Sequence, residues 1–348
     1  MACLMRDDVI ETIDDISVII CAYTEERWND LVAAVESVQK QILPPREIIV
    51  VIDHNPNLME RTRQQVPGVT VVENMEALGL SGARNSGIAV AKSQIIAFLD
   101  DDAVATPDWL MLLSEEFTDP QVLGTGGAVT PLWLGKAPAW LPEEFFWVVG
   151  CTYLGMPQTV QTIRNPVGAN MAFRREVFDA VGGFRNGIGR VGTLPVGCEE
   201  TELCIRARQH WPRGAFLYQP EARVFHRVPG HRTSWRYFCE RCFAEGRSKA
   251  VITSYVGAKD SLSSELTYTL RTLSKGIVHH ILNGVFRLDV CGFLRAATIN
   301  SGFMITMMGY LIGSVFLRVA RSRKHSEKEG VLPSNDEMIQ LSKLHHKV

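Results

Sequence analysis

Short apolar, β-branched runs alternate with amphipathic stretches from Ile16 onward, and this alternation constrains the fold more than any other feature of the sequence. The apolar runs have the length of strands and span residues 16–21, 47–52, 69–72 and 95–99. The amphipathic stretches have the length of helices and span 27–41, 58–65, 82–92 and 107–117. Strands and helices in this order are typical of βαβ units. We therefore predict an α/β fold with a doubly wound, Rossmann-like, mostly parallel sheet.

The chain divides by pattern into a main domain and flanking segments. With 348 residues, of which 46% are hydrophobic, it can bury one large core. We expect an N-terminal tail at 1–15, the α/β domain at 16–233, a helical region at 234–320 and a polar tail at 321–348.

Charge and cysteine content narrow the class of protein. A net charge of −2 provides no basic field of the kind that binds phosphate backbones, so we expect no nucleic-acid partner. The eight cysteines and the lack of an apolar leader in the first twenty residues favour a reducing cytosol. Cys239 and Cys242 form a lone CxxC, which we interpret as two helix residues rather than a zinc or redox site.

Polar residues follow three of the predicted strands. They are Ala22 to Glu25 after the first strand, Asp53 to Asn55 after the second, and Asp100 to Asp102 after the fourth. Ligands of open α/β sheets bind at the carboxyl ends of the strands, so these groups are expected to line one cleft.

The run Asp100-Asp101-Asp102 is the strongest local signal for chemistry. Three adjacent carboxylates repel one another unless protons or a cation intervene, and a hard divalent ion is a suitable partner. The alternative is a solvated acidic turn. Mg²⁺ often completes its coordination with substrate phosphates, which suits a substrate bearing a diphosphate.

Residues 79–87 are rich in glycine and open a predicted helix. They lack the lysine of a P-loop and the spacing of a dinucleotide fingerprint. What remains is a helix N-terminus carrying Arg84 and Asn85, which could approach a phosphate or the acidic run.

Taken in order, the motifs resemble those of family 2 glycosyltransferases with the GT-A fold, over roughly Ile16 to His226. They are the segments 17–26, 47–53, 79–87, 97–102, 166–175, 181–184 and 198–203. Two segments depart from the family pattern, because Cys21-Ala22-Tyr23-Thr24 replaces Pro-Thr-Tyr-Asn and Asp53-His54-Asn55 replaces Asp-Gly-Ser. The resemblance implies an inverting, metal-assisted transfer of a sugar from a nucleotide diphosphate.

The resemblance also implies roles for individual residues. A nucleotide-sugar, most simply a UDP-sugar, would be bound by Ala22, Tyr23, Glu25, Asp53, Gly79, Ser81, Arg84, Asp100 and Asp101. Mg²⁺ or Mn²⁺ would be held by Asp102, Asp100 and His226. Gly168 and Asn170 would lie on the acceptor side. The family's Glu-Asp base motif reads Glu199-Glu200 here, so Glu200 would be the general base with Glu199 beside it.

Residues 296–317 contain no charged side chain and are long enough, as a helix, to cross a bilayer. Cations flank the segment on both sides, so one crossing would leave one cationic flank on the outer side, against the positive-inside rule, and a hairpin or re-entrant arrangement is the alternative. We expect a membrane-associated enzyme on the cytoplasmic face, acting on a lipid-linked or polysaccharide acceptor. A nucleotidyltransferase and a non-catalytic membrane scaffold that binds nucleotide-sugars are the competing hypotheses.

Overall fold

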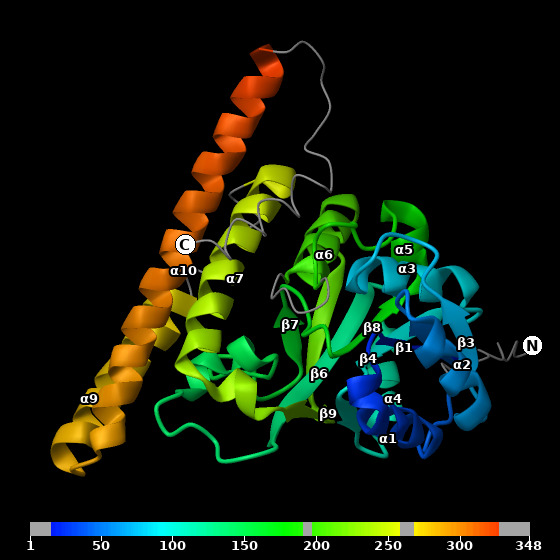
Figure 1. Cartoon of the computed structure of the whole chain (residues 1–348), viewed down its shortest axis with the longest axis horizontal. Coiled ribbons are helices and arrows are strands. Elements are labelled where there is room, and N and C mark those ends of the chain that lie inside the picture. The colour runs from blue at the N-terminus through cyan, green and yellow to red at the C-terminus, as the bar shows by residue number, and fades with distance from the viewer. Residues whose placement is uncertain (1–14, 191–196, 258–267, 327–348) are drawn as a thin grey trace, which may run out of the picture.

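The computed structural model describes residues 15–190, 197–257 and 268–326 (Figure 1). The predicted N-terminal tail, apart from Asp15, and the predicted polar tail from residue 327 onward lie outside these ranges. The described elements run from a sheet flanked by helices to a set of long C-terminal helices.

The first four strands form the parallel part of the sheet, in the order β3-β2-β1-β4. Their bounds are β1 Ile16–Ala22, β2 Glu47–Ile52, β3 Thr70–Glu73 and β4 Ile95–Asp100. Every end of these four strands lies within one residue of the end that we predicted. The predicted helices are α1 Trp28–Gln39, α2 Pro56–Gln65, α3 Leu80–Val90 and α4 Trp109–Glu115.

The second half of the sheet is mixed rather than parallel. Its strands are β5 Ala103–Ala105, β6 Val122–Trp133, β7 Gln161–Ile163, β8 Asn170–Arg174 and β9 Ala215–Val228. β8 pairs antiparallel with both β4 and β6, whereas β6 and β9 run parallel. The doubly wound α/β fold is confirmed, and the parallel pairing that we predicted for most of the sheet holds mainly in its first half.

Both faces of the sheet are buried. Val18 and Ile20 of β1 face one apolar cluster, while Ile19 between them faces the other. Successive side chains of a strand point to opposite faces, so a strand covered on both sides reads as a continuous apolar run. Gly87 lets α3 lie close to this sheet, because a Cβ there would come 2.7 Å from the Ile19 side chain.

Further helices follow in the second half. They are α5 Arg175–Val181, α6 Glu199–His210, α7 Trp235–Val256, α9 Ser274–Phe286 and α10 Val290–Ser326, with short 3-10 segments η1 Glu25–Arg27, η3 Glu143–Val149 and η4 Gly230–Thr233. Figure 1 shows α7 lying between the sheet domain and α10, with α9 beside the first part of α10. Cys239 and Cys242 both lie on α7, as the helix interpretation predicted.

The apolar segment predicted at 296–317 lies within α10. Among the described residues, one helix is long and apolar enough to cross a membrane, and it spans the 30 residues Val290–Val319. Only a small part of its most apolar window is buried within the protein.

Candidate active site

The acidic run meets His226 because of strand pairing. Asp100 ends β4, and three residues later β5 begins and pairs antiparallel with β9, setting Ala103 opposite His226. The Arg227 amide also donates to the Asp102 carbonyl at 2.8 Å. Ligand atoms of Asp100, Asp102 and His226 consequently lie within 4.8 Å of one another. Two carboxylates and an imidazole suit a divalent ion, so these three residues form a group that could hold one.

Asp102 is the centre of charge in this group. His226 Nε2 lies 3.1 Å from Asp102 Oδ1, Arg27 Nη1 lies 3.1 Å from Oδ2, and Arg232 Nη2 lies 3.7 Å from Oδ2. Burial acts to raise the pKa of Asp102, but His226 and the two arginines outweigh it and lower the pKa. Asp102 is therefore held as a carboxylate, the form that a metal requires.

Asp101 differs from its neighbour although it is equally buried. Arg27 Nη1 donates to its Oδ1 at 2.9 Å, and its Oδ2 is buried with no hydrogen-bond partner among the described residues. Burial, and next the charge of Asp102, raise the pKa of Asp101. An unpaired buried oxygen is costly, so a further donor or cation at this position would stabilise the site.

Two arginines of this site were not foreseen from the sequence. Arg27 ends η1, the short helix that comes soon after β1, so its place near that strand end was a usable signal. Its guanidinium also lies 5.5 Å from the Tyr23 ring centre. Arg232 lies in η4, where no local pattern marks it, and its Nη1 is buried without a partner among the described residues. Burial, and then Arg190, lower the pKa of Arg232.

Arg84 joins the acidic run to the start of α6. Its guanidinium donates to Glu199 Oε1 at 2.7 Å and to the Gly168 carbonyl at 3.0 Å, and it lies 3.5 Å from Asp100 Oδ1. Only 2% of this side chain is exposed. A buried arginine needs such partners, because an unpaired charge in the interior is expensive.

Glu200 follows in the first turn of α6 and is partly buried. No side chain pairs with its carboxylate among the described residues, whereas the carboxylate of Glu199 is held by Arg84. Burial and then the charge of Glu199 raise the pKa of Glu200 to about 8, with Arg84 acting in the opposite direction. Of these two neighbouring acids, Glu200 is the one that is available to exchange a proton near neutral pH.

Asp53 lies just after β2, and its carboxylate has three partners. Its Oδ1 accepts from Asn74 Nδ2 at 2.6 Å and contacts His54 Nδ1 at 2.9 Å, and its Oδ2 accepts from the Gly79 amide at 2.9 Å. Asp53 thereby ties the end of β2 to the residue that precedes α3. Tyr23 and Ala22 lie at the adjoining end of β1, and Glu25 points to Arg61 at 3.7 Å.

Ser81 and Asn170, which we predicted to lie on the donor side and the acceptor side of the site, also have hydrogen-bond partners within the protein. The Ser81 hydroxyl donates to the Ile188 carbonyl at 2.5 Å. Asn170 is fully buried, donates to the carbonyls of Ala128 and Ala222, and accepts from Trp109 Nε1 at 2.7 Å. Because these bonds use both polar atoms of its amide, Asn170 joins strands β6 and β9 to α4 rather than facing an acceptor.

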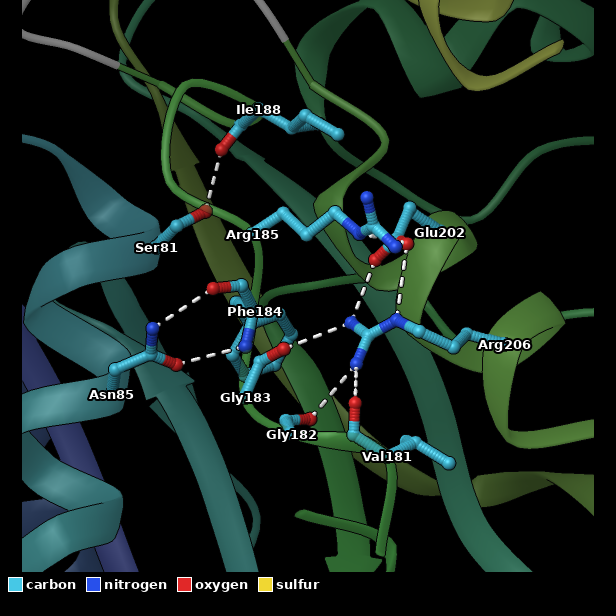
Figure 2. Close-up of polar contacts among 10 residues, drawn as sticks. All are labelled: Ser81, Asn85, Val181, Gly182, Gly183, Phe184, Arg185, Ile188, Glu202 and Arg206. Carbon is cyan, nitrogen blue, oxygen red and sulfur yellow. Dashed lines mark hydrogen bonds and ion pairs between the residues drawn. The ribbon is translucent and has the colours of Figure 1, made fainter. Parts of the chain in front are cut away.

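The loop after α5 is clamped between α3 and α6 (Figure 2). Asn85 bonds both the amide and the carbonyl of Phe184 at 2.8 Å. Arg206 donates to Gly183 and pairs with the fully buried Glu202, which also pairs with Arg185 at 2.6 Å. A Cβ at Gly183 would overlap the Asn85 side chain. The clamp fixes α6, and with it Glu199 and Glu200, relative to α3.

Several known proteins are similar to this chain in sequence. The model of Glycosyl transferase family 2 matches residues 17–182. A glucosyl-dolichyl phosphate glucuronosyltransferase of Haloferax volcanii is 34% identical over 241 residues, which are 68% of this chain and 77% of that protein. The succinoglycan biosynthesis protein ExoM of Rhizobium meliloti is 26% identical over 243 residues, 66% of this chain and 72% of its own length.

Among solved structures, the fold is similar to a crystal structure of GalNAc-T7 with UDP, GalNAc and Mn²⁺, at a TM-score of 0.48 and 19% identity. The match covers 67% of this chain and 48% of that one. The residues matched by the family model include the strand-end acids and the glycine-rich opening of α3. This chain belongs to glycosyl transferase family 2.

Proposed function

We propose that the protein is an inverting glycosyltransferase that moves a sugar from a UDP-sugar to a hydroxyl of a lipid-linked acceptor, with Glu200 as the general base. The observation that carries this proposal is the position of Arg84, whose guanidinium contacts Asp100 on one side and Glu199 on the other. This shared contact supports the proposal that the acids suited to a metal and the acids suited to proton transfer belong to one site.

The residues divide the reaction between two ends of this site. Glu200 would take the proton from the attacking hydroxyl, an effect worth about 10²–10⁴-fold in rate. Asp100, Asp102 and His226 would hold Mg²⁺ or Mn²⁺, which when bound supplies positive charge for the diphosphate. Arg27 and Arg232 stand beside Asp102 and could add further positive charge. Attack on the face opposite the leaving diphosphate inverts the anomeric carbon.

The proposed nucleotide site and the proposed acceptor are inferred from different parts of the molecule. Asp53 and Tyr23, at the ends of β2 and β1, would border the nucleotide. The lipid-linked acceptor is suggested by the Haloferax relative, whose name specifies a glucosyl-dolichyl phosphate, and by the apolar helix α10. We place the enzyme at the cytoplasmic face of a membrane. A polysaccharide acceptor, suggested by the relative ExoM, is the second candidate.

Release of UDP tests the proposal. The full chain is given UDP-glucuronic acid, UDP-glucose and GDP-mannose with Mn²⁺, with and without a polyprenyl-phosphate glucose. We expect one UDP-sugar to yield UDP only when the acceptor is present. Release of UDP with no acceptor dependence, or release of pyrophosphate, would contradict sugar transfer and favour hydrolysis or nucleotidyl transfer.

Asp102→Asn provides the matching binding test. It removes a carboxylate beside His226, so we expect calorimetry to show Mn²⁺-dependent donor affinity falling by more than about tenfold, since even the outer partners of metal ligands contribute that much. Asp108→Asn, a change of the same kind at a side chain that makes no capping hydrogen bond, is the control and should leave affinity unchanged. Equal affinities in both variants would remove Asp102 from the metal site.

A further inference from the structure

The two last described helices carry an apolar outer face. On α10 the exposed side chains recur at helical spacing and include Met304, Met308, Leu311 and Val315. On α9 they include Val285 and Phe286, the latter 79% exposed. We call this surface the outer face. A stripe of this kind on a water-soluble surface is costly, which indicates that something apolar covers it.

The opposite face of α10 is fixed to α7 by small residues. A Cβ at Gly246 of α7 would overlap the Thr306 carbonyl, and a Cβ at Gly309 of α10 would overlap the Phe243 carbonyl. One helical turn further on, a Cβ at Gly313 would lie 3.0 Å from the Ala250 side chain. The two backbones therefore lie in close contact along several turns of α10, as Figure 1 shows for the helices as a whole.

This close contact is incompatible with a simple crossing of the bilayer. The contact covers residues 306–313, the centre of the apolar segment, and the same stretch of α7 carries Arg241, Glu245 and Lys249. If α10 crossed a bilayer as packed here, these charges would lie near its midplane. Charged side chains are costly at that depth and are rare in segments that cross a bilayer.

Charge around the outer face points to a membrane surface with anionic lipids. Residues 268–319 contain five cations, namely Arg271, Lys275, Arg287, Arg295 and Arg318, and one acid, Asp289. Asp289 pairs with Arg295 at 3.3 Å. Arg271, Lys275 and Arg287 are exposed, and they lie just before, within and just after α9. An apolar stripe bordered by cations is the pattern of helices that lie in the interface of a bilayer.

We propose that α9 and α10 attach the protein to one leaflet of an anionic bilayer, with α10 lying in the plane of the interface instead of crossing it. The inference specifies the membrane association proposed above, but it does not depend on the sugar-transfer chemistry. It accounts for cations at both ends of the apolar segment, because both ends stay on the same side of the membrane.

Flotation with lipid vesicles tests the attachment. The full chain is mixed with vesicles of phosphatidylcholine, alone or with phosphatidylglycerol. We expect the protein to float with the anionic vesicles and the double variant Leu311→Glu, Val315→Glu to lose at least about tenfold in partition, since each apolar side chain contributes roughly that factor. Ile42→Glu, an equally exposed apolar site on the sheet domain, is the control and should float like the wild type.

Topology and self-association provide the outcomes that would overturn the proposal. Tags before Met1 and after Val348 should be digested from the same side of inside-out vesicles prepared from cells, and digestion from opposite sides would establish a crossing. If light scattering shows a dimer that the double variant dissociates without any change in flotation, the outer face is a contact between two copies. We expect the double variant to release UDP in detergent at the wild-type rate. Its loss of flotation would then reflect membrane attachment and not the catalytic site.

Discussion

At the residue scale, neighbouring acids in this site have been given different properties by their surroundings. Asp101 and Asp102 are both buried, yet contact with His226 lowers the pKa of Asp102 while the pKa of Asp101 rises. Arg84 holds the carboxylate of Glu199, whereas burial and the charge of Glu199 raise the pKa of Glu200. Such separation of paired carboxylates is how a single fold assigns binding and proton transfer to adjacent residues.

The first residue-scale prediction concerns Glu200→Gln. The change removes basicity with little change in volume, so turnover should fall by about 10²–10⁴-fold while donor affinity stays near that of the wild type. A base must be unprotonated to act, so kcat/KM of the wild type should rise with pH up to about 8, the pKa of Glu200. Glu176→Gln, at an exposed acid of α5, is the control.

The same carboxyl affects stability with a definite sign. Its pKa is raised from 4.5 in a free chain to about 8 in the folded protein, so the folded state binds the extra proton between these values. Stability from this group is therefore present at low pH and is lost as pH rises toward 8. Thermal unfolding should show Glu200→Gln gaining over the wild type as pH is raised from 5 to 8. A constant difference would mean that the pKa is not shifted.

At the element scale, α6 is positioned by contacts with segments remote in sequence. Asn85 of α3 and Arg206 of α6 form hydrogen bonds to the loop 181–185 from opposite sides, as Figure 2 shows. The short loop motif could be read from the sequence, but its partners could not. Side-chain bonds to backbone carbonyls leave no periodic pattern, so nothing in the order of residues marks Asn85 as a clamp.

The clamp predicts a difference between two asparagines. Asn85→Ala breaks both bonds to Phe184, which should lower the free energy of unfolding by about 1–3 kcal/mol. Asn186→Ala removes only an exposed bond to Glu76, a residue that Asn85 also contacts, and should cost much less. Chemical denaturation of both variants measures the contrast. Equal losses would show that the loop is held by other contacts.

At the scale of the whole molecule, the site is assembled from distant parts of the chain. Asp53 is tied to Gly79, Arg84 to Glu199, and Asp102 to His226, so strands β2 and β9 and helices α3 and α6 all contribute to the proposed site. A ligand that binds only this assembled state stabilises the fold by mass action, by about 2.7 kcal/mol at a hundred times its Kd.

This linkage gives a whole-molecule prediction. With Mn²⁺ present, UDP should raise the melting temperature more than GDP or CDP, and removal of the metal with a chelator should abolish most of the rise. The shift should disappear in Asp102→Asn. A UDP-dependent rise that persists in that variant and with the chelator present would mean that the nucleotide binds without the acidic group.

The sequence by itself determined the parts of this protein that depend on local order: the four early strands, the helices between them, the acids at the strand ends and the apolar stretch in α10. Periodicity fixes these, because each segment shows its burial in its own residues. Only the tertiary structure decided which distant groups meet. The family resemblance had grouped His226 with Asp102, and the pairing of β5 with β9 is the physical reason that they meet. η4 brings in Arg232, and glycine contacts hold α10 against charged α7, neither of which was foreseen. Those contacts arise from register between remote segments, which the chemistry of neighbouring residues does not encode.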